Sequence, residues 1–425
     1  MKSNGGVRLM AVGLAMCLGI AVLPAMAAGK VCDVKSYGAK GDGTTKDTVA
    51  VQKAIDECAV NSGTVEVPAG TYVIAPILLK SNTTLHLAKD AKLLGSPDRA
   101  DYPKYTFARH PTVQPLVSSL NSENIAITGE GTIDGNGQIW WDYVRGVRDS
   151  GVLGTDHPRP MGVVFDHSKN IRMEGVTVQN AGFWQIVPYY ADHLVFRNIR
   201  ILAPRSPNTD AIDPFSSSNI VIDHVFSSVG DDNIAIKSGE INSPGPDLPS
   251  KNITITDCTF ENGHGLSIGS EIAGGVQNVH AERIHFKGTD QGIRIKAARD
   301  RGNDVSNISY KDITMEDVKT AILVTEYYPH PAPEGEVPAE PVGRLTPKFH
   351  GITIENVTAT GSGSAGIIVG LPESPVFDLT MKNVHLAGKT GLSIAYAKVT
   401  MDDVTVKPDT GEAITVAKTA TVTKK

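Results

Sequence analysis

Two stretches, "NIVIDHV" (219–225) and "NITITDC" (252–258), decide the fold, because both alternate apolar and polar residues in the same pattern. Alternation with a period of two indicates a half-buried β-strand. Copies of this template begin at residues 170, 193, 219, 252, 278, 307, 351, 378 and 398, so successive starts lie 20 to 44 residues apart. A repeat of this kind predicts a solenoid in which each copy stacks on the next.

A second apolar strand follows the template, as in "NIAIK" at 233, "GLSIG" at 265 and "GIRIK" at 292. Two or three short strands per turn, each stacking on its equivalent, describe a parallel β-helix. The helical spacing of "DTVAVQKAIDECA" (47–59) predicts one N-terminal helix, with Asp47 as its N-cap. We expect this helix to cap the open end of an all-β solenoid.

The template assigns structural roles to residues that otherwise suggest function. Cys258 occupies the place that Val225 holds in the preceding copy, so we expect its side chain in the core. The glycosylation sequons that begin at Asn252 and Asn307 fall where Asn219 also sits. A repeated structural asparagine therefore explains them better than glycosylation does.

The first residues resemble a secretory signal peptide. Lys2 and Arg8 precede a short apolar run, and a small-residue cleavage site follows at "AMA" (25–27). The run is too short to span a bilayer comfortably, and no other stretch approaches the roughly 20 apolar residues that a span needs. We expect residues 1–27 to be removed and residues 28–425 to form one exported β-helix domain without a membrane anchor.

Charge and cysteine content restrict the partners and the compartment. Without Lys2 and Arg8, 38 of the 40 basic side chains remain against 46 acidic ones, a formal charge of −8. This balance argues against a nucleic-acid partner, which would need a basic surface. In an oxidising compartment we expect Cys32 and Cys58, which flank a short N-terminal segment, to form a disulfide.

The strand-like stretches "SPNTDAIDP" (206–214) and "VGDDNIAIKSG" (229–239) hold three carboxylates of the kind usually found exposed, namely Asp210, Asp231 and Asp232. When "AIDPF", "NIAIK", "GLSIG" and "GIRIK" are placed in register, four polar residues form one column on rungs about 4.8 Å apart: Asp210, Asp232, His264 and Gln291. Arg294 and Lys296 lie on the outward face, because Ile293 and Ile295 take the inward positions.

Strict alternation would point Asp210 and Asp232 into the apolar core, where unpaired carboxylates are too costly. We infer that the backbone turns at each strand entry, helped by Gly230, Gly263 and Gly265. With Asp231 beside them, three carboxylates then share one cleft. Their repulsion raises the pKa of at least one of the carboxyl groups and leaves a protonated acid beside an ionised base. Glycoside hydrolysis requires such a pair.

Four short motifs carry a resemblance to a known family: "NTD" (208–210), "GDD" (230–232), "GHG" (263–265) and "RIK" (294–296). In this order they resemble the signature motifs of the polygalacturonases, glycoside hydrolase family 28. The resemblance covers essentially the whole mature chain, and the combination is specific although each tripeptide alone is not. It implies a right-handed β-helix, a pectic substrate and inversion of configuration.

The resemblance also implies roles for residues in the cleft. Asp231 corresponds to the general acid that protonates the leaving oxygen, while Asp210 and Asp232 correspond to the pair that positions and deprotonates the water. His264 would tune the acid. Asn208 would orient that group.

The remaining matches concern the substrate, a polygalacturonate chain. Arg294 and Lys296 would bind the galacturonate carboxylate next to the scissile bond through strong, directional charge-assisted contacts. Tyr328 matches the substrate-binding tyrosine of the family better than its neighbour Tyr327. We expect a monomer that needs neither a cofactor nor a metal.

Several alternatives stay open. The enzyme could be an exo-polygalacturonase. A rhamnogalacturonan hydrolase is a second alternative, although the "RIK" motif suggests a uronate carboxylate beside the cleaved bond. A β-helix pectate lyase would need calcium and a basic residue, and an adhesin would have no reason to assemble such a set. Endo cleavage is favoured from the layout around "WWDYVRG" at 140. The loops at 238–250 and in the Pro-rich stretch 329–348, which we expect to be inserted beside the cleft, could instead wall one end of it.

Overall fold

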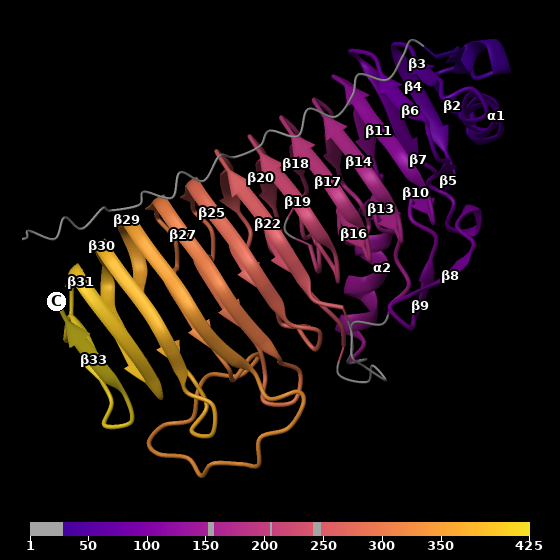
Figure 1. Ribbon diagram of the computed structural model, residues 1–425. Coiled ribbons are helices and arrows are strands. Elements are labelled where there is room, and N and C mark those ends of the chain that lie inside the picture. The colour runs from indigo at the N-terminus through magenta and orange to yellow at the C-terminus, as the bar shows by residue number, and fades with distance from the viewer. Residues whose placement is uncertain (1–28, 152–156, 205, 241–247) are drawn as a thin grey trace, which may run out of the picture.

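A single-stranded parallel β-helix, confirming the expected fold class, runs through the part of the chain that the computed structural model describes, residues 29–151, 157–204, 206–240 and 248–425. The predicted signal peptide lies outside these residues. Each turn contributes strands to three parallel stacks that extend along the molecule (Figure 1).

The first stack contains the template strands. Its members are β1 (Val31–Asp33), β3 (Thr64–Val67), β6 (Thr84–Leu87), β11 (Glu123–Gly129), β14 (Lys169–Glu174), β17 (Asp192–Arg197), β19 (Ser218–Asp223) and β22 (Ser250–Thr256). The second stack follows one bend later. Its members are β2 (Asp42–Lys46), β4 (Gly70–Ile74), β7 (Ala91–Gly95), β12 (Thr132–Asp134), β15 (Thr177–Gln179), β18 (Arg200–Leu202), β20 (Phe226–Val229) and β23 (Thr259–Asn262).

The third stack holds the second apolar strand of each turn. Its members are β5 (Ile77–Leu79), β10 (Val117–Leu120), β13 (Val163–Asp166), β16 (Ile186–Tyr189), β21 (Ile234–Ile236), β24 (Leu266–Ile268), β26 (Gln291–Lys296) and β28 (Thr320–Thr325). Toward the C-terminus longer strands continue the stacks: β25 (Val276–Lys287), β27 (Asp304–Glu316), β29 (Lys348–Val369), β30 (Val376–Ala395) and β31 (Ala397–Pro408), then β32 (Ile414–Val416) and β33 (Thr421–Lys424).

Ladders of like residues fill the interior. In the first stack, one such ladder is a continuous register of fully buried aliphatic side chains: Ile220, Ile253, Val279, Ile308 and Ile352. Each such side chain contributes about 1.5–3 kcal/mol by leaving water. Cys258 is buried in the same core, as the template predicts.

A ladder of asparagines fixes one bend of the coil. The Asn252 side-chain amide donates to Asn219 at 2.9 Å, Asn278 donates to Asn252 at 2.9 Å, and Asn307 donates to Asn278 at 2.7 Å. All four backbones are left-handed, with φ between 55° and 57°, a conformation that asparagine tolerates better than most residues. The structural role predicted for the two sequons is therefore confirmed.

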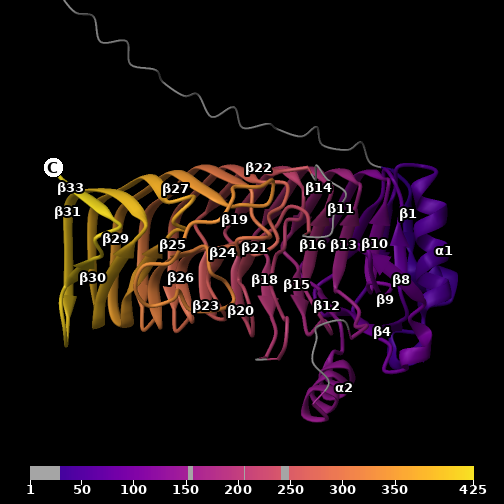
Figure 2. The same ribbon diagram turned by 90° about the horizontal axis from the view of Figure 1, so that it is seen from below.

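Helix α1 (Thr48–Ala59) covers the N-terminal end of the solenoid, where it packs against β1, β3 and β5 (Figure 2). The predicted disulfide between Cys32 and Cys58 ties β1 to this helix, with Cα atoms 6.1 Å apart. Asp47 is the N-cap residue of α1, as predicted, but its side chain makes no capping hydrogen bond. Its carboxylate accepts from the backbone N–H groups of Lys40 and Gly41, at 2.7 and 2.9 Å, and so fixes the preceding turn instead.

Two insertions interrupt the coils on the side of the third stack. Strands β8 (Lys104–Phe107) and β9 (His110–Val113) form an antiparallel hairpin between β7 and β10. The Pro-rich stretch 329–348 forms, up to residue 347, a loop between β28 and β29, as predicted (Figure 1).

Three short helical segments complete the described elements, namely η1 (Val34–Tyr37), η2 (Arg99–Asp101) and α2 (Gln138–Asp149). The tryptophans of "WWDYVRG" lie in α2, which projects from the solenoid (Figure 2). Among the described residues, no helix combines the length and the apolar character needed to cross a bilayer.

Candidate active site

The predicted register of the third stack is confirmed. Ile212 pairs with Ile234, Ile234 with Leu266, and Leu266 with Ile293. The positions two residues earlier therefore form the expected column: Asp210, Asp232, His264 and Gln291.

The backbone turns before these strands, as inferred. Gly263 and Gly265 have φ values of 73° and 78°, a region that side chains with a Cβ rarely adopt, and so they place His264 at the entry of β24. Gly230 contributes through its N–H group, which donates to the Thr209 hydroxyl at 3.1 Å. Asp210 and Asp232 are nevertheless only 3% and 1% exposed, so the turns do not spare these carboxylates from burial, contrary to the expectation.

Asp232 lies at the centre of the site. One carboxylate oxygen accepts from the Ser267 hydroxyl at 2.8 Å and from Arg294 at 2.9 Å, and the other accepts from Lys296 at 2.8 Å. Burial alone would raise the pKa of Asp232, but the charges of Lys296 and Arg294 outweigh it and hold this pKa well below its usual range. Asp232 is therefore ionised.

Arg294 and Lys296 point away from the apolar core, as the alternation predicts. Their pairing with Asp232 nevertheless leaves them only 7% and 4% exposed. The ring of Tyr328 faces both cations, with its centroid 5.5 Å from Arg294 Cζ and 5.0 Å from Lys296 Nζ. Three of the four predicted substrate-binding residues, all except Asn208, therefore lie together at one side of Asp232.

Asp231 and His264 form the accessible part of the site, with side chains 24% and 31% exposed. Nδ1 of His264 lies 3.0 Å from a carboxylate oxygen of Asp231 and 3.9 Å from one of Asp232. Its Nε2 lies 3.6 Å from Asp290, which the sequence analysis did not identify. The imidazole therefore bridges three carboxylates, and Asp231 is the one among the predicted aspartates that a substrate could reach most easily.

Asp210 is buried, and its neighbour Asp213 was not among the residues predicted from the sequence. Burial, with the nearby charges of Asp231 and Asp213, raises the pKa of Asp210 well above its usual value. Burial also raises the pKa of Asp213 to about 8, although Lys237 Nζ lies 3.6 Å away. Alternation along "AIDPF" places Asp213 opposite Ile212, so the sequence carried a signal for this residue.

Asn208 contacts Arg159, which was also not among the residues predicted from the sequence. The side-chain oxygen of Asn208 accepts from the Arg159 guanidinium at 2.9 Å, and the same guanidinium donates to the carbonyl of Pro207 at 2.6 Å. Burial lowers the pKa of Arg159 to about 10, against the opposing influence of Asp210 and Asp231. The predicted role of Asn208 in orienting Asp231 stays a prediction.

The donor atoms of Asp231, Asp232 and His264 lie within 4.8 Å of one another, a spacing that a metal ion could use. The surroundings do not fit a cation. Both oxygens of Asp232 already accept from positive groups, and those two buried charges would repel a divalent ion. This set therefore serves acid–base chemistry better than metal binding.

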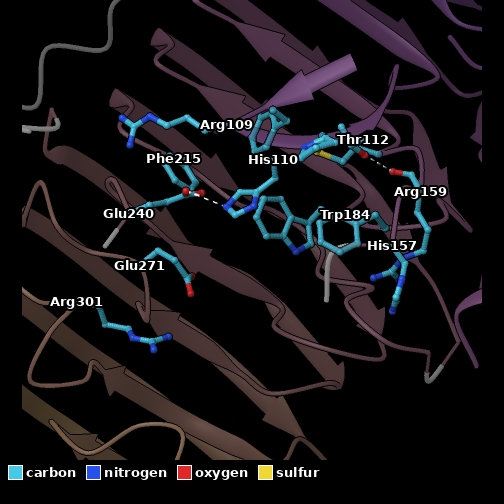
Figure 3. Close-up of a pocket in the computed structure, with 14 residues that line it drawn as sticks. Arg109, His110, Thr112, His157, Arg159, Trp184, Phe215, Glu240, Glu271 and Arg301 are labelled. Carbon is cyan, nitrogen blue, oxygen red and sulfur yellow. Dashed lines mark hydrogen bonds and ion pairs between the residues drawn. The ribbon is translucent and has the colours of Figure 1, made fainter. Parts of the chain in front are cut away.

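A pocket of about 470 Å³ lies between the β8–β9 hairpin and the third stack (Figure 3). Its lining is aromatic and charged: Phe107, Arg109, His110, Pro111, Thr112, His157, Arg159, Met161, Phe183, Trp184, Phe215, Glu240, Glu271 and Arg301. Arg159 connects it to Asn208, and Glu271 connects it to Lys237 at 3.5 Å.

Residues 58–410 match the model of the glycosyl hydrolases family 28. The chain is 32% identical over 373 residues to a probable polygalacturonase of Vitis vinifera, covering 83% of this chain and 74% of that protein. It is 29% identical over 370 residues to an endo-polygalacturonase of Pectobacterium carotovorum subsp. carotovorum, covering 82% and 85%. The solved family 28 exopolygalacturonase of Yersinia enterocolitica superposes with a TM-score of 0.83 at 24% identity, covering 93% of this chain and 78% of that one.

Proposed function

The chain belongs to glycosyl hydrolases family 28, and from that premise we propose that it is a secreted enzyme that hydrolyses α-1,4-galacturonosidic bonds of polygalacturonate with inversion. The single observation that carries the proposal is the environment of Asp232. An ionised carboxylate is fixed between two cations, while the more exposed Asp231 stands beside it. This arrangement separates a base from an acid.

In this mechanism Asp231 donates its proton to the leaving glycosidic oxygen. Asp232 takes a proton from the attacking water, because the neighbouring cations keep it ionised. Asp210, whose raised pKa favours the protonated form, positions that water as a hydrogen-bond partner. His264 contacts Asp231 and sets its orientation.

The spacing of the carboxylates needs a specific placement of the water. Oxygens of Asp231 and Asp232 lie within 4.8 Å, whereas inverting pairs are usually about 6.5–9.5 Å apart and retaining pairs about 5–5.5 Å. Inversion therefore rests on the family resemblance. It requires the water to lie between Asp232 and Asp210 instead of between the acid and the base.

The substrate carboxylate would be recognised by donors that Asp232 does not use. Arg294 has five N–H donors, and its hydrogen bond to Asp232 is made by Nη1. Lys296 likewise retains donors beyond its bond to Asp232. A uronate placed against Tyr328 would lie within reach of both cations, which a neutral sugar would not need.

The test is the release of reducing ends from polygalacturonate in the presence of a chelator, with Asp231→Asn as the inactive control. Hydrolysis gives reducing ends without a rise in ultraviolet absorbance. Chelator-sensitive activity with unsaturated products would instead identify a lyase. Equal activity on a neutral-sugar polymer would contradict recognition of the uronate.

Secretion is proposed from the first 27 residues. N-terminal sequencing of the protein recovered from the medium or the periplasm should begin near Ala28. The mode of cleavage is a separate question, because the relatives include an endo enzyme and the structural neighbours an exo enzyme. The layout of the sequence favours endo cleavage, whereas the pocket between the β8–β9 hairpin and the third stack favours exo cleavage.

A further inference from the structure

We propose that Arg159 is a positioning residue for the reaction: its buried guanidinium fixes the turn at 207–210 and sets which end of the Asn208 amide faces the reacting groups. The inference rests on the proposed function and deepens it. Arg159 lies outside the four sequence motifs, 49 residues before Asn208. Asn208 and Asp210 both belong to this turn, so whatever holds the turn also holds two residues on which the proposed mechanism depends.

The guanidinium of Arg159 joins two successive turns of the solenoid. Its Nη1 donates to the carbonyl of Gly182 at 3.2 Å and to the carbonyl of Pro207 at 2.6 Å, and its Nη2 donates to Oδ1 of Asn208 at 2.9 Å. Gly182 lies between β15 and β16, whereas Pro207 and Asn208 lie between β18 and β19. Because the fork of an arginine is planar and rigid, these acceptors are fixed relative to one another.

Arg159 is itself held firmly. It is only 1% exposed, and its Cζ lies 4.5 Å from the centroid of the Phe183 ring, within the range of a cation–π contact. Its carbonyl accepts from the Thr112 hydroxyl at 3.1 Å, and the next carbonyl, of Pro160, accepts from the Phe183 N–H group at 3.1 Å. Burial lowers the pKa of Arg159 to about 10, which leaves the group charged at acidic and neutral pH. A charged donor therefore stands at a fixed place beside the turn.

Arg159 also determines the orientation of the Asn208 amide. An arginine offers donors alone, so the amide oxygen faces it and the NH2 group, with its two donors, points elsewhere. The charges of Asp210 and Asp231 both influence Arg159, so carboxylates are the acceptors on this side of the cleft. With the amide held this way, Asn208 can donate to Asp231 and orient it. A flipped amide would present a further acceptor to these carboxylates instead.

Neutral hydrogen bonds hold the same turn at a second point. The Thr209 hydroxyl donates to the carbonyl of Pro204 and accepts from the Gly230 N–H group, both at 3.1 Å. Hydrogen bonds from a charged donor are about twice as strong as neutral ones. Loss of Arg159 should therefore leave the turn attached to the solenoid but free to shift relative to Asp231. A misplacement of about 1 Å can cost ~10²-fold in rate.

The test is a double-mutant cycle of Arg159→Met and Asn208→Ala, with kcat and KM measured on polygalacturonate. Arg159→Met should lower kcat by about 100-fold with little change in KM, because the turn no longer holds the reacting groups in place. Asn208→Ala should cost about 10-fold or more in kcat in the wild-type background and almost nothing in the Arg159→Met background. Equal costs in both backgrounds, or a raised KM with unchanged kcat in Arg159→Met, would overturn the inference.

Arg172→Met is the matched control for the cycle. Arg172 lies in β14 on the first stack, away from the third stack, and pairs with Glu174. Asn208→Ala should keep its full cost in this background. If Arg159→Met does not fold, Arg159→Lys takes its place.

Lysine keeps the positive charge but lacks the planar fork, so Arg159→Lys should also lose kcat and weaken the effect of Asn208→Ala. Full activity of Arg159→Lys would show that the charge suffices and would contradict a positioning role. If the wild-type protein releases no reducing ends from polygalacturonate, the proposed function itself fails. An active wild type with an additive cycle refutes the inference about Arg159 alone, so the two failures are distinguishable.

Discussion

Replacing Lys296 with methionine should raise the pKa of the catalytic base. Lys296 Nζ donates to Asp232 at 2.8 Å, and both side chains are nearly buried, so solvent screens the pair weakly. A hydrogen bond to a charged group is worth about 1.5–3 kcal/mol, and one pKa unit corresponds to about 1.4 kcal/mol. Loss of the ammonium group should therefore raise the pKa of Asp232 by about 1–2 units, while Arg294 still holds the other oxygen.

The direction of the effect follows from the role of Asp232. The base must be ionised, so activity is lost when the pH falls through its pKa, and a higher pKa moves this loss to higher pH. In Lys296→Met, the acid limb of the kcat/KM profile should therefore shift upward by about 1–2 units. A substrate with many methyl esters should be used, because few of its carboxylates titrate in the same range.

A comparison of free and esterified polygalacturonate tests a second role of Lys296, the recognition of the substrate carboxylate. If the ammonium group also reads the substrate carboxylate, the plateau of kcat/KM should fall more on free polygalacturonate than on the esterified polymer. Lys382→Met is the control, since this exposed lysine pairs with Glu355 on the surface. An unmoved acid limb would refute the claim that Lys296 keeps Asp232 ionised, and equal plateau losses would refute carboxylate recognition.

Three further predictions concern single features of the fold and site. Asp231→Asn should fold and bind substrate but lose ~10²–10⁴ in kcat, measured by steady-state kinetics; a smaller loss would exclude it as the acid. The pKa of Asp213 is raised to about 8, so the folded protein retains a proton that the unfolded chain loses, and stability falls as the pH rises from about 4 to 8. Asp213→Asn should flatten this decline, measured as melting temperature against pH. An equally steep decline in the variant would contradict the role of Asp213. Replacing both Cys32 and Cys58 with serine should lower the unfolding free energy by about 3–4 kcal/mol in denaturant titrations, and an unchanged midpoint would show that the bond is not stabilising.

The repetitive part of this structure could be predicted because its information is local. Alternation marks each strand, and stacking of like residues fixes the register, so the pairing of Ile234 with Leu266 and the column of Asp232 and His264 follow from the sequence. The asparagine ladder at Asn252 follows for the same reason.

Residues that depend on long-range placement were missed. Arg159 reaches Asn208 across several turns, and nothing near Arg159 in the sequence indicates this contact. The β8–β9 hairpin was missed because its residues lack the template, and its meaning depends on Phe107 packing against β13 and β16. Asp47 shows the limit of local rules, since its carboxylate had a closer partner in the preceding turn than in the helix.

The most direct test of the proposed inverting hydrolysis is proton nuclear magnetic resonance of the first products from polygalacturonate, recorded before mutarotation equilibrates the anomers. Attack by water from the face opposite the α-linkage should give reducing ends that appear first as the β-anomer. The α-anomer appearing first would show retention and contradict the placement of water between Asp232 and Asp210. Signals of an unsaturated uronate would contradict hydrolysis itself.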